Sequence, residues 1–440
     1  MAVLDKELAK YYRILRHSDL CVYEGKISKI VGMTVEATGL VCSIGDICNI
    51  YLENKQGSII AEVVGISGNR AYLMPYEGMN GIGYGCAVIN TGKKLTVKIS
   101  DALVGRIVDP LGNPIDRGPA LEKEGVPFSI DGMPSNPMAR PQISEPMEMG
   151  VKSIDSLLTI GKGQRMGIFS GSGVGKSTLM GMIARNVKAD INVIGLVGER
   201  GREVVEFMNR DLGEEGLARS VLVVATSDQP AMMRYKCALT ATAIAEYFCS
   251  QGMHVLLMMD SLTRFAMAQR EIGLSTGEAP VARGYTPSIY SAMPKLLERC
   301  GNFEYGSITG IYTVLVEGDD TNEPISDIVR GIIDGHIILS RRLAARNHYP
   351  AIDVLSSISR LMNDIVDENQ LEIASRFRNL LAIYKENEDL ISIGAYKGGT
   401  NPALDYSIAH NTGMNNFLKQ TVGEKFGYEE TTELMLKAIS

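Results

Sequence analysis

A glycine-rich segment between an apolar run and a helix-like run constrains this chain more than any other feature. Ser170 to Thr178 read S-G-S-G-V-G-K-S-T, Met166–Phe169 precede them, and Leu179–Asn186 follow. Strand, glycine-rich loop and helix in this order form the context of a phosphate-binding loop. Glycines let successive N–H groups turn inward around a phosphate chain, and the N-terminus of the next helix adds partial positive charge. The segment therefore predicts a nucleotide site.

The loop departs from the full G-x-x-x-x-G-K-[ST] pattern at its first position, where Ser170 replaces glycine. Its end, Gly175-Lys176-Ser177, is intact, and the apolar strand before it argues against a merely flexible linker. Lys176 is expected to reach the β- and γ-phosphates of ATP, and the Ser177 hydroxyl to bind Mg²⁺. The residues predicted to bind the nucleotide here are Gly171, Ser172, Gly173, Val174, Gly175, Lys176, Ser177 and Thr178.

Composition narrows the class of protein. A chain of 440 residues with 45% hydrophobic and 22% charged residues fits two or three globular domains. The net charge of −7 argues against a nucleic-acid partner, which usually requires a basic face. No apolar run is long enough to span a membrane, and the N-terminus lacks a signal core. Seven scattered cysteines without a C-x-x-C pair predict a reducing, cytoplasmic compartment.

The pattern along the chain predicts an α/β protein with three parts after an N-terminal helix. Residues 1–19 read as a short amphipathic helix that either packs on the body or docks a partner. Residues 20–95 hold short β-branched runs separated by Gly, Asn and Asp, which is typical of a small β-barrel. Residues 96–363 are expected to form a P-loop (RecA-like) α/β domain, and residues 364–440 a C-terminal helical domain.

Within residues 96–363, apolar runs alternate with helix-length stretches and predict a mostly parallel sheet. The expected strands are 165–169, 192–197, 220–225, 254–259 and 308–315, and 351–355 also resembles an apolar strand. Residues 96–150 carry turn signals and six prolines between 118 and 146. This stretch is therefore expected to be a connector over a domain surface.

Three polar segments follow strand-like runs, where parallel sheets bind ligands. Asp260 ends an apolar strand and is a candidate Mg²⁺ ligand, although an aspartate can also cap a helix. Glu199 follows the expected strand 192–197 and could act as general base towards water. Arg200 and Glu203 follow it and either contact phosphate or form a solvated charge cluster. Arg360, with small neighbours, is a candidate arginine finger for an adjacent subunit.

Several motifs in a fixed order carry a resemblance to a known family. The phosphate loop, G-E-R-G-R-E (198–203), M-M-D-S-L-T-R-F-A (258–266) and N-H-Y-P-A-I-D-V-L-S-S-I-S-R (347–360) resemble catalytic subunits of the rotary ATP synthase superfamily. Four further segments resemble the flagellar and type III protein-export ATPases more than synthase β subunits: 105–116, 160–177, 261–280 and 396–405. The resemblance covers about residues 20–435.

The resemblance implies roles for individual residues. Glu199 matches the catalytic glutamate, Arg200 and Arg264 match arginines near the γ-phosphate, and Glu203 and Asp260 match acidic residues near the metal. Tyr349 matches the tyrosine that stacks on adenine, and Arg360 the finger that reaches the neighbouring site. Because one chain carries both Glu199 and Arg360, a homohexamer with ATP between subunits is expected.

The implied function is ATP hydrolysis, with Mg²⁺, that energises flagellar protein export from the cytoplasmic face of a type III apparatus. The implied partners are a stator-like export regulator at residues 1–19, export gate and stalk proteins, and export substrates or chaperones at the C-terminal domain. Three alternatives stay open: an injectisome ATPase for virulence effectors, an RNA-translocating hexameric helicase, and a proton-translocating ATP synthase catalytic subunit. The net charge and missing aromatic RNA motifs argue against the helicase.

Overall fold

The computed structural model describes residues 24–52, 57–121, 125–316 and 323–440. The predicted helix at 1–19 lies outside these residues. The chain divides into two compact units. One holds the described residues up to Leu95 together with Ser275–Gly277, and the other holds Thr96–Leu274 and Glu278–Ser440.

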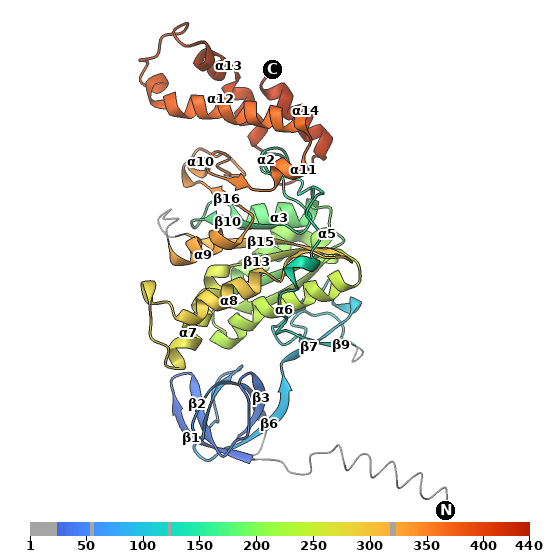
Figure 1. The fold of residues 1–440 in the computed structure, drawn as a ribbon, viewed down its shortest axis with the longest axis vertical. Coiled ribbons are helices and arrows are strands. Elements are labelled where there is room, and N and C mark those ends of the chain that lie inside the picture. Colours follow the sequence, from blue (N-terminus) through green and yellow to red (C-terminus); the bar gives the residue numbers. More distant parts are fainter. Residues whose placement is uncertain (1–23, 53–56, 122–124, 317–322) are drawn as a thin grey trace, which may run out of the picture. The chain divides into compact units, whose positions relative to one another are not determined.

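The first unit is a closed antiparallel β-barrel, as the pattern of short strands predicts (Figure 1). Its strands follow the spatial order β1-β2-β5-β4-β3-β6, and their inward side chains form a separate apolar core around Val35, Ile50, Val63 and Leu73. The strands are β1 (Glu24–Val31), β2 (Thr34–Thr38), β3 (Asp46–Tyr51), β4 (Ser58–Ser67), β5 (Arg70–Pro75) and β6 (Ala87–Lys94).

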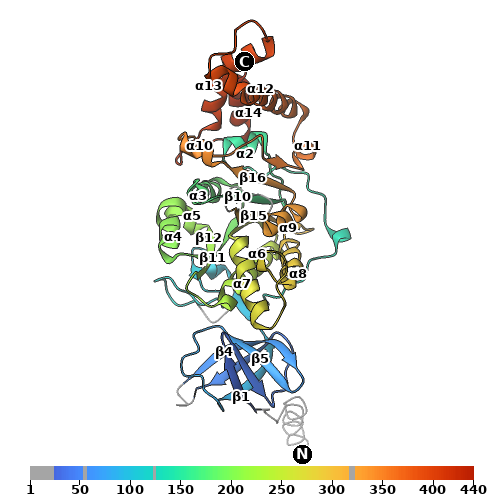
Figure 2. The same cartoon turned by 90° about the vertical axis from the view of Figure 1, so that its left-hand side faces the viewer.

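The second unit is built on a mostly parallel sheet in the order β17-β16-β10-β15-β13-β11-β12-β8, with β14 paired to β15. Helices flank the sheet (Figures 1 and 2), so strands such as β11 are buried along their whole length. The strands are β8 (Ile107–Val108), β10 (Arg165–Ser170), β11 (Ile191–Glu199), β12 (Ser220–Thr226), β13 (His254–Asp260), β14 (Gly301–Asn302), β15 (Ser307–Leu315), β16 (Gly335–Leu339) and β17 (Ile358–Ser359).

Apolar side chains of the helices in this α/β part pack against those of the sheet and form one hydrophobic core with them. Helix α6 packs against β11, β12 and β13. The helices are α2 (Lys152–Leu157), α3 (Lys176–Asn186), α4 (Gly201–Glu206), the π-helical turn η3 (Phe207–Leu212), α5 (Gly213–Ala218), α6 (Ala231–Ser250), α7 (Leu262–Ser275), α8 (Pro287–Leu297), α9 (Pro324–Ile332), α10 (Arg341–Ala345) and α11 (Met362–Ile365), with short turns η1 (Asp101–Leu103), η2 (Pro137–Ala139) and η4 (Ala282–Gly284).

Two expectations for this part were incomplete or wrong. The stretch 96–150 is more than a surface connector, because β8 pairs with β12 in the main sheet, and β7 (Thr96–Ile99) pairs with β9 (Val126–Ser129). Residues 351–355 do not form a strand; Ile352 makes one isolated bridge to Leu339, and a turn follows. Their apolar side chains fill the core instead: Ala351, Ile352 and Val354 are each buried.

The C-terminal region is helical, as predicted, and its helices gather at one end of the second unit beside α2 (Figures 1 and 2). It consists of α12 (Glu368–Ser392), α13 (Pro402–Leu418) and α14 (Tyr428–Ala438). The Phe377 and Phe417 rings meet edge-on, with centroids 5.4 Å apart, and join α12 to α13. The Gly398-Gly399 break lies between these two helices.

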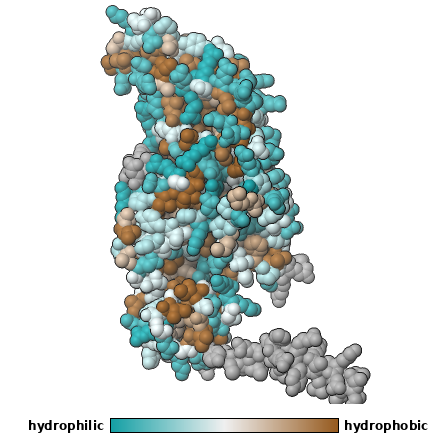
Figure 3. Space-filling model, viewed as in Figure 1, coloured by the Kyte–Doolittle hydropathy of each residue, from teal (hydrophilic) through white to brown (hydrophobic). Residues whose placement is uncertain are grey.

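Apolar side chains on the surface are scattered among polar ones on the face seen in Figure 3. Within the described ranges, the search for a helix of sufficient length and apolar character to cross a bilayer finds none. The six cysteines among these residues are free thiols, and all except the half-buried Cys42 are buried.

Gly181 allows the helix after the phosphate loop to pack closely on η3. A methyl group at this position would overlap the carbonyl of Asp211, whose carbon would lie 2.7 Å away. We expect Gly181→Ala to destabilise the second unit by about 1–3 kcal/mol through overpacking, measured as a lower thermal unfolding midpoint. Gly331→Ala is the matched control, because Gly331 is a helical glycine with open space around it, and this change should be neutral or stabilising. Equal effects of the two changes would contradict the packing argument.

Candidate active site

The phosphate loop connects the carboxyl end of β10 to the first turn of α3. Gly173 and Gly175 have φ angles of +77° and +88°, a region that other residues adopt only with strain. Position 171 requires glycine for another reason, because a Cβ atom there would lie 2.6 Å from the Arg341 guanidinium. The glycines that the motif supplies are therefore required by backbone conformation and by close packing. Val174 is buried in the core rather than facing the loop's cavity.

Lys176 joins the loop to two carboxylates at the ends of neighbouring strands. Its Nζ lies 2.5 Å from Asp260 Oδ1 and 3.5 Å from Glu199 Oε1, and its side chain is 12% exposed. Burial disfavours the charged ammonium, but the two carboxylates outweigh it and raise the pKa of Lys176. Lys176 is thus a charged group at pH 7 that stabilises the two buried acids.

Glu199 ends β11 and is 8% exposed. Burial and the negative charge of Asp260 raise the pKa of Glu199 to about 7, against the opposing effect of Lys176. A carboxyl with a pKa near the pH of a cell is suited to accept a proton from water.

Asp260 ends β13, and a neighbouring strand fixes its orientation. Thr313 Oγ1 on β15 donates a hydrogen bond of 2.7 Å to Asp260 Oδ1, the oxygen that also binds Lys176. Because β10, β15, β13 and β11 are adjacent in the sheet, their carboxyl ends place the loop, Asp260 and Glu199 together. The sequence did not indicate Thr313, because its hydrogen bond to Asp260 depends on β15 and β13 being neighbours in the sheet.

Two predicted arginines lie at the cavity beside the loop. Arg200 is exposed and pairs with Glu203 of α4 at 3.4 Å. Arg264 of α7 packs under Gly198, and its buried Nε has no hydrogen-bond partner among the described residues. Buried polar atoms normally have partners, so this Nε is poised to bind a ligand group.

The phosphate-side cavity has a volume of about 630 Å³ and brings most predicted residues together. Five residues that were not predicted as site residues also line it: the polar Ser170, Arg210 and Arg341, and the apolar Leu315 and Val316. Arg341 follows β16, a strand that was not identified, so the strand-end rule was not applied to it. Arg210 lies in a π-helical turn that has no sequence signal. The predicted residues lining this cavity are Gly171, Ser172, Gly173, Gly175, Lys176, Ser177, Thr178, Glu199, Arg200, Glu203 and Arg264.

A second cavity of about 750 Å³ also borders the loop. Gly173, Gly175 and Thr178 line both cavities. Tyr349 is 40% exposed and lies against the loop, since a side chain at Gly175 would meet its ring at 3.3 Å. The backbone of Gln420, after α13, donates to the Tyr349 carbonyl at 3.0 Å. The tyrosine is thus held between the loop and the C-terminal helices.

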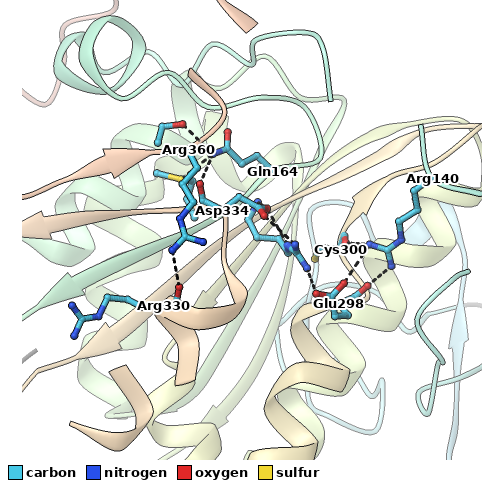
Figure 4. A network of polar contacts seen from close by, with 10 residues as sticks. Arg140, Gln164, Glu298, Cys300, Arg330, Asp334 and Arg360 are labelled. Atoms are coloured by element: carbon cyan, nitrogen blue, oxygen red, sulfur yellow. Dashed lines mark hydrogen bonds and ion pairs between the residues drawn. The ribbon is translucent and has the colours of Figure 1, made fainter. Parts of the chain in front are cut away.

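Arg360 lies away from both cavities and from the loop. Asp260 and Val174 also line neither cavity, but Asp260 binds Lys176 and Val174 belongs to the loop itself. Its N–H donates to the Asp334 carbonyl at 2.9 Å, and its guanidinium reaches the Arg330 carbonyl at 3.4 Å (Figure 4). Asp334 also binds Arg165, the first residue of β10, whereas the phosphate loop follows the last residue of that strand. Arg360 therefore lies at the opposite edge of the sheet, separated from the loop by the length of β10, roughly 17 Å. Within one chain it does not contribute to the site.

The donor set at the loop suits Mg²⁺ better than a transition metal. Ser177 lines the cavity, Asp260 provides a fixed carboxylate, and Glu203 is at the rim. Within the described ranges, there is no cluster of three or more His, Cys, Asp or Glu side chains that could hold a metal without a ligand's help. This composition fits a hard cation bound by one or two protein oxygens together with phosphates.

Family models match three consecutive segments of the chain. The β-barrel domain of the ATP synthase alpha/beta family matches residues 27–92, and the nucleotide-binding domain of that family matches residues 150–359. The C-terminal domain of the type III secretion ATPase EscN matches residues 366–437. A flagellum-specific ATP synthase of Bacillus subtilis is 55% identical over 92% of this chain and 93% of its own length. This chain belongs to the ATP synthase alpha/beta family.

Other members of the ATP synthase alpha/beta family belong to two export systems. A type 3 secretion system ATPase of Xanthomonas euvesicatoria is 49% identical over 93% of each chain. The solved structure of the assembled ATPase EscN from enteropathogenic E. coli is 45% identical, covers 94% of this chain and 100% of its own, and superposes with a TM-score of 0.90. EscN in complex with its central stalk EscO gives a TM-score of 0.88 at 44% identity. The predicted family and fold class are confirmed.

The raised pKa of Glu199 makes stability depend on pH. Between its ordinary pKa of 4.5 and about 7, the folded state holds a proton that the unfolded state has released. Stability therefore falls as pH rises through this window, by up to about 3 kcal/mol. Glu199→Gln cannot ionise, so its thermal unfolding midpoint should rise relative to the parent chain between pH 5 and pH 8. Glu429→Gln, a one-charge change on the exposed face of α14, controls for net charge. A Glu199→Gln difference that is the same at both pH values would contradict this assignment.

Proposed function

We propose that this chain is an ATP-hydrolysing motor subunit that energises flagellar protein export through a type III secretion apparatus. The observation that carries the proposal is the buried group of Lys176, Glu199 and Asp260 at the carboxyl edge of the sheet, next to a phosphate-binding loop. The 55% identity to a flagellum-specific ATP synthase favours the flagellar system.

ATP would lie with its phosphates on the loop and its base in the cavity beside Tyr349, since both cavities share loop glycines. The loop N–H groups, the N-terminus of α3 and Lys176 would bind the phosphates. Drawing Lys176 towards the phosphates weakens its hold on Glu199, which then accepts the proton of the attacking water. Arg200 and Arg264 would stabilise negative charge on the γ-phosphate oxygens.

Ser177, Asp260 and Glu203 would hold Mg²⁺ directly or through water. The ion, when bound, neutralises charge on the β- and γ-phosphates. The hydrogen bond from Thr313 keeps the Asp260 carboxylate in one orientation for this role.

A homohexamer would complete each site. Arg360 lies at the sheet edge opposite its own loop, and this position supports a role at the loop of another copy rather than at its own. The assembled form of EscN and its complex with a central stalk support a ring and a stalk partner for this chain. We further propose a cytoplasmic location at the export apparatus, a regulator at residues 1–19, the export gate as a partner, and substrates or chaperones at α12–α14.

A virulence-type injectisome is the second candidate system, because a type 3 secretion ATPase is 49% identical and EscN shares the whole fold. Deletion of the gene decides between the two. Loss of flagellar filaments with intact effector secretion supports the flagellar system, and the reverse supports the injectisome.

Lys176→Ala and Glu199→Gln should each abolish most ATP hydrolysis. Loss of the general base alone is expected to reduce kcat by about 10²–10⁴-fold. Phosphate release is the measurement. Glu199→Gln should retain ATP binding, while Lys176→Ala should weaken it. Wild-type turnover by either variant would contradict the site assignment.

Arg360→Ala should reduce hydrolysis by about 10³-fold or more if the residue acts across the subunit boundary. Mixing it 1:1 with Lys176→Ala should restore activity at about a quarter of the interfaces, where an intact loop faces an intact Arg360. Arg376→Ala, on the exposed surface of α12, is the control and should keep full activity. Failure of the mixture to exceed either variant alone would rule out shared sites.

A further inference from the structure

Lys152 is a buried cation beside the base-side cavity that the export mechanism above does not use. It is the first residue of α2 and is 8% exposed. Its ammonium lies over the ring of Phe426 at 4.5 Å and the ring of Phe417 at 5.7 Å. Its backbone N–H donates to Gln420 Oε1 at 2.9 Å, so the residue is held against the segment after α13.

The Lys152 ammonium makes no hydrogen bond or ion pair with any of the described residues. Burial lowers the pKa of Lys152, and the negative charges of Glu424 and Glu430 oppose this effect only in part. The two aromatic faces offset part of the cost of burying the charge. The three N–H donors of an ammonium still require acceptors. The cavity of about 750 Å³ that Lys152 lines is the place where a ligand could provide one.

Among the described polar residues that line this cavity, Gln420 is the other buried one, and it already has partners. Its amide accepts from the Lys152 backbone N–H and donates to the carbonyls of Gly150 and Glu424. Lys152 is therefore the buried donor left for a ligand. A donor-only group selects an acceptor, and the ring nitrogens of a purine are acceptors, whereas the exocyclic amino group of adenine is not.

We propose that Lys152 donates a hydrogen bond to a ring nitrogen of the nucleotide base, and so sets affinity for the base rather than for the phosphates. The proposal rests on the proposed function, because it assumes that the phosphates lie on the loop. Tyr349 supplies a stacking face, and Lys152, braced by two phenyl rings, reads an edge of the base.

The test separates the base from the phosphates in the full-length protein. Lys152→Met keeps an unbranched apolar chain between Phe417 and Phe426 but removes every donor. Isothermal titration should show that the Kd of ATP rises roughly 10-fold or more, while the Kd of inorganic tripolyphosphate is unchanged. Equal weakening of both ligands, or no change in either, would overturn the proposal and leave Lys152 as a structural clamp.

A second measurement uses the unaltered chain, in case Lys152→Met folds poorly. Analogues of ATP in which N1, N3 or N7 is replaced by carbon are compared with ATP. At least one should bind roughly 10-fold more weakly, and equal binding of all three would overturn the proposal. Tripolyphosphate that fails to bind the unaltered chain would instead count against the phosphate site itself, and the analogue series would still decide the role of Lys152.

Discussion

The buried ammonium of Lys176 between Glu199 and Asp260 is the interaction on which the active site depends. Two carboxylates at strand ends a few ångströms apart repel each other, and burial increases the cost of both charges. One cation at the start of α3 makes their coexistence possible. The same cation belongs to the phosphate loop, so the loop, β11 and β13 are electrostatically linked before any ligand arrives. Binding of phosphates therefore changes the environment of the residue proposed as general base.

The parallel sheet explains why so much of this site was predictable from the sequence. Glu199 and Asp260 each follow an apolar run, and parallel strands bring their carboxyl ends to one edge. The loop itself has a sequence pattern that specifies its conformation, and Gly173 and Gly175 adopt the left-handed conformations that it requires. The family motifs then added Arg264 and Tyr349, for which spacing alone gave no argument.

The residues that were missed depend on spatial neighbours that the sequence does not state. Thr313 binds Asp260 only because β15 lies between β10 and β13, and Arg341 packs on Gly171 only because β16 pairs with β10. The position of the Lys152 ammonium depends on two phenylalanine rings that lie far along the chain from it, Phe417 and Phe426. Residues 351–355 were misjudged because an apolar run fills a core equally well with or without strand pairing. The two-residue strand β8 was missed because it lies in the stretch 96–150, whose turn signals and prolines predicted a connector.

The position of Arg360 has a consequence for how the cell can use this protein. A single molecule cannot bring Arg360 to its own phosphate loop without dismantling the sheet that lies between them. If Arg360 completes the site of a neighbouring copy, as proposed above, the rate of ATP hydrolysis would rise more steeply than in proportion to protein concentration, because only copies in contact could complete a reaction. Single copies away from the assembly site would then hydrolyse little ATP. A high local concentration of copies at that site would start hydrolysis.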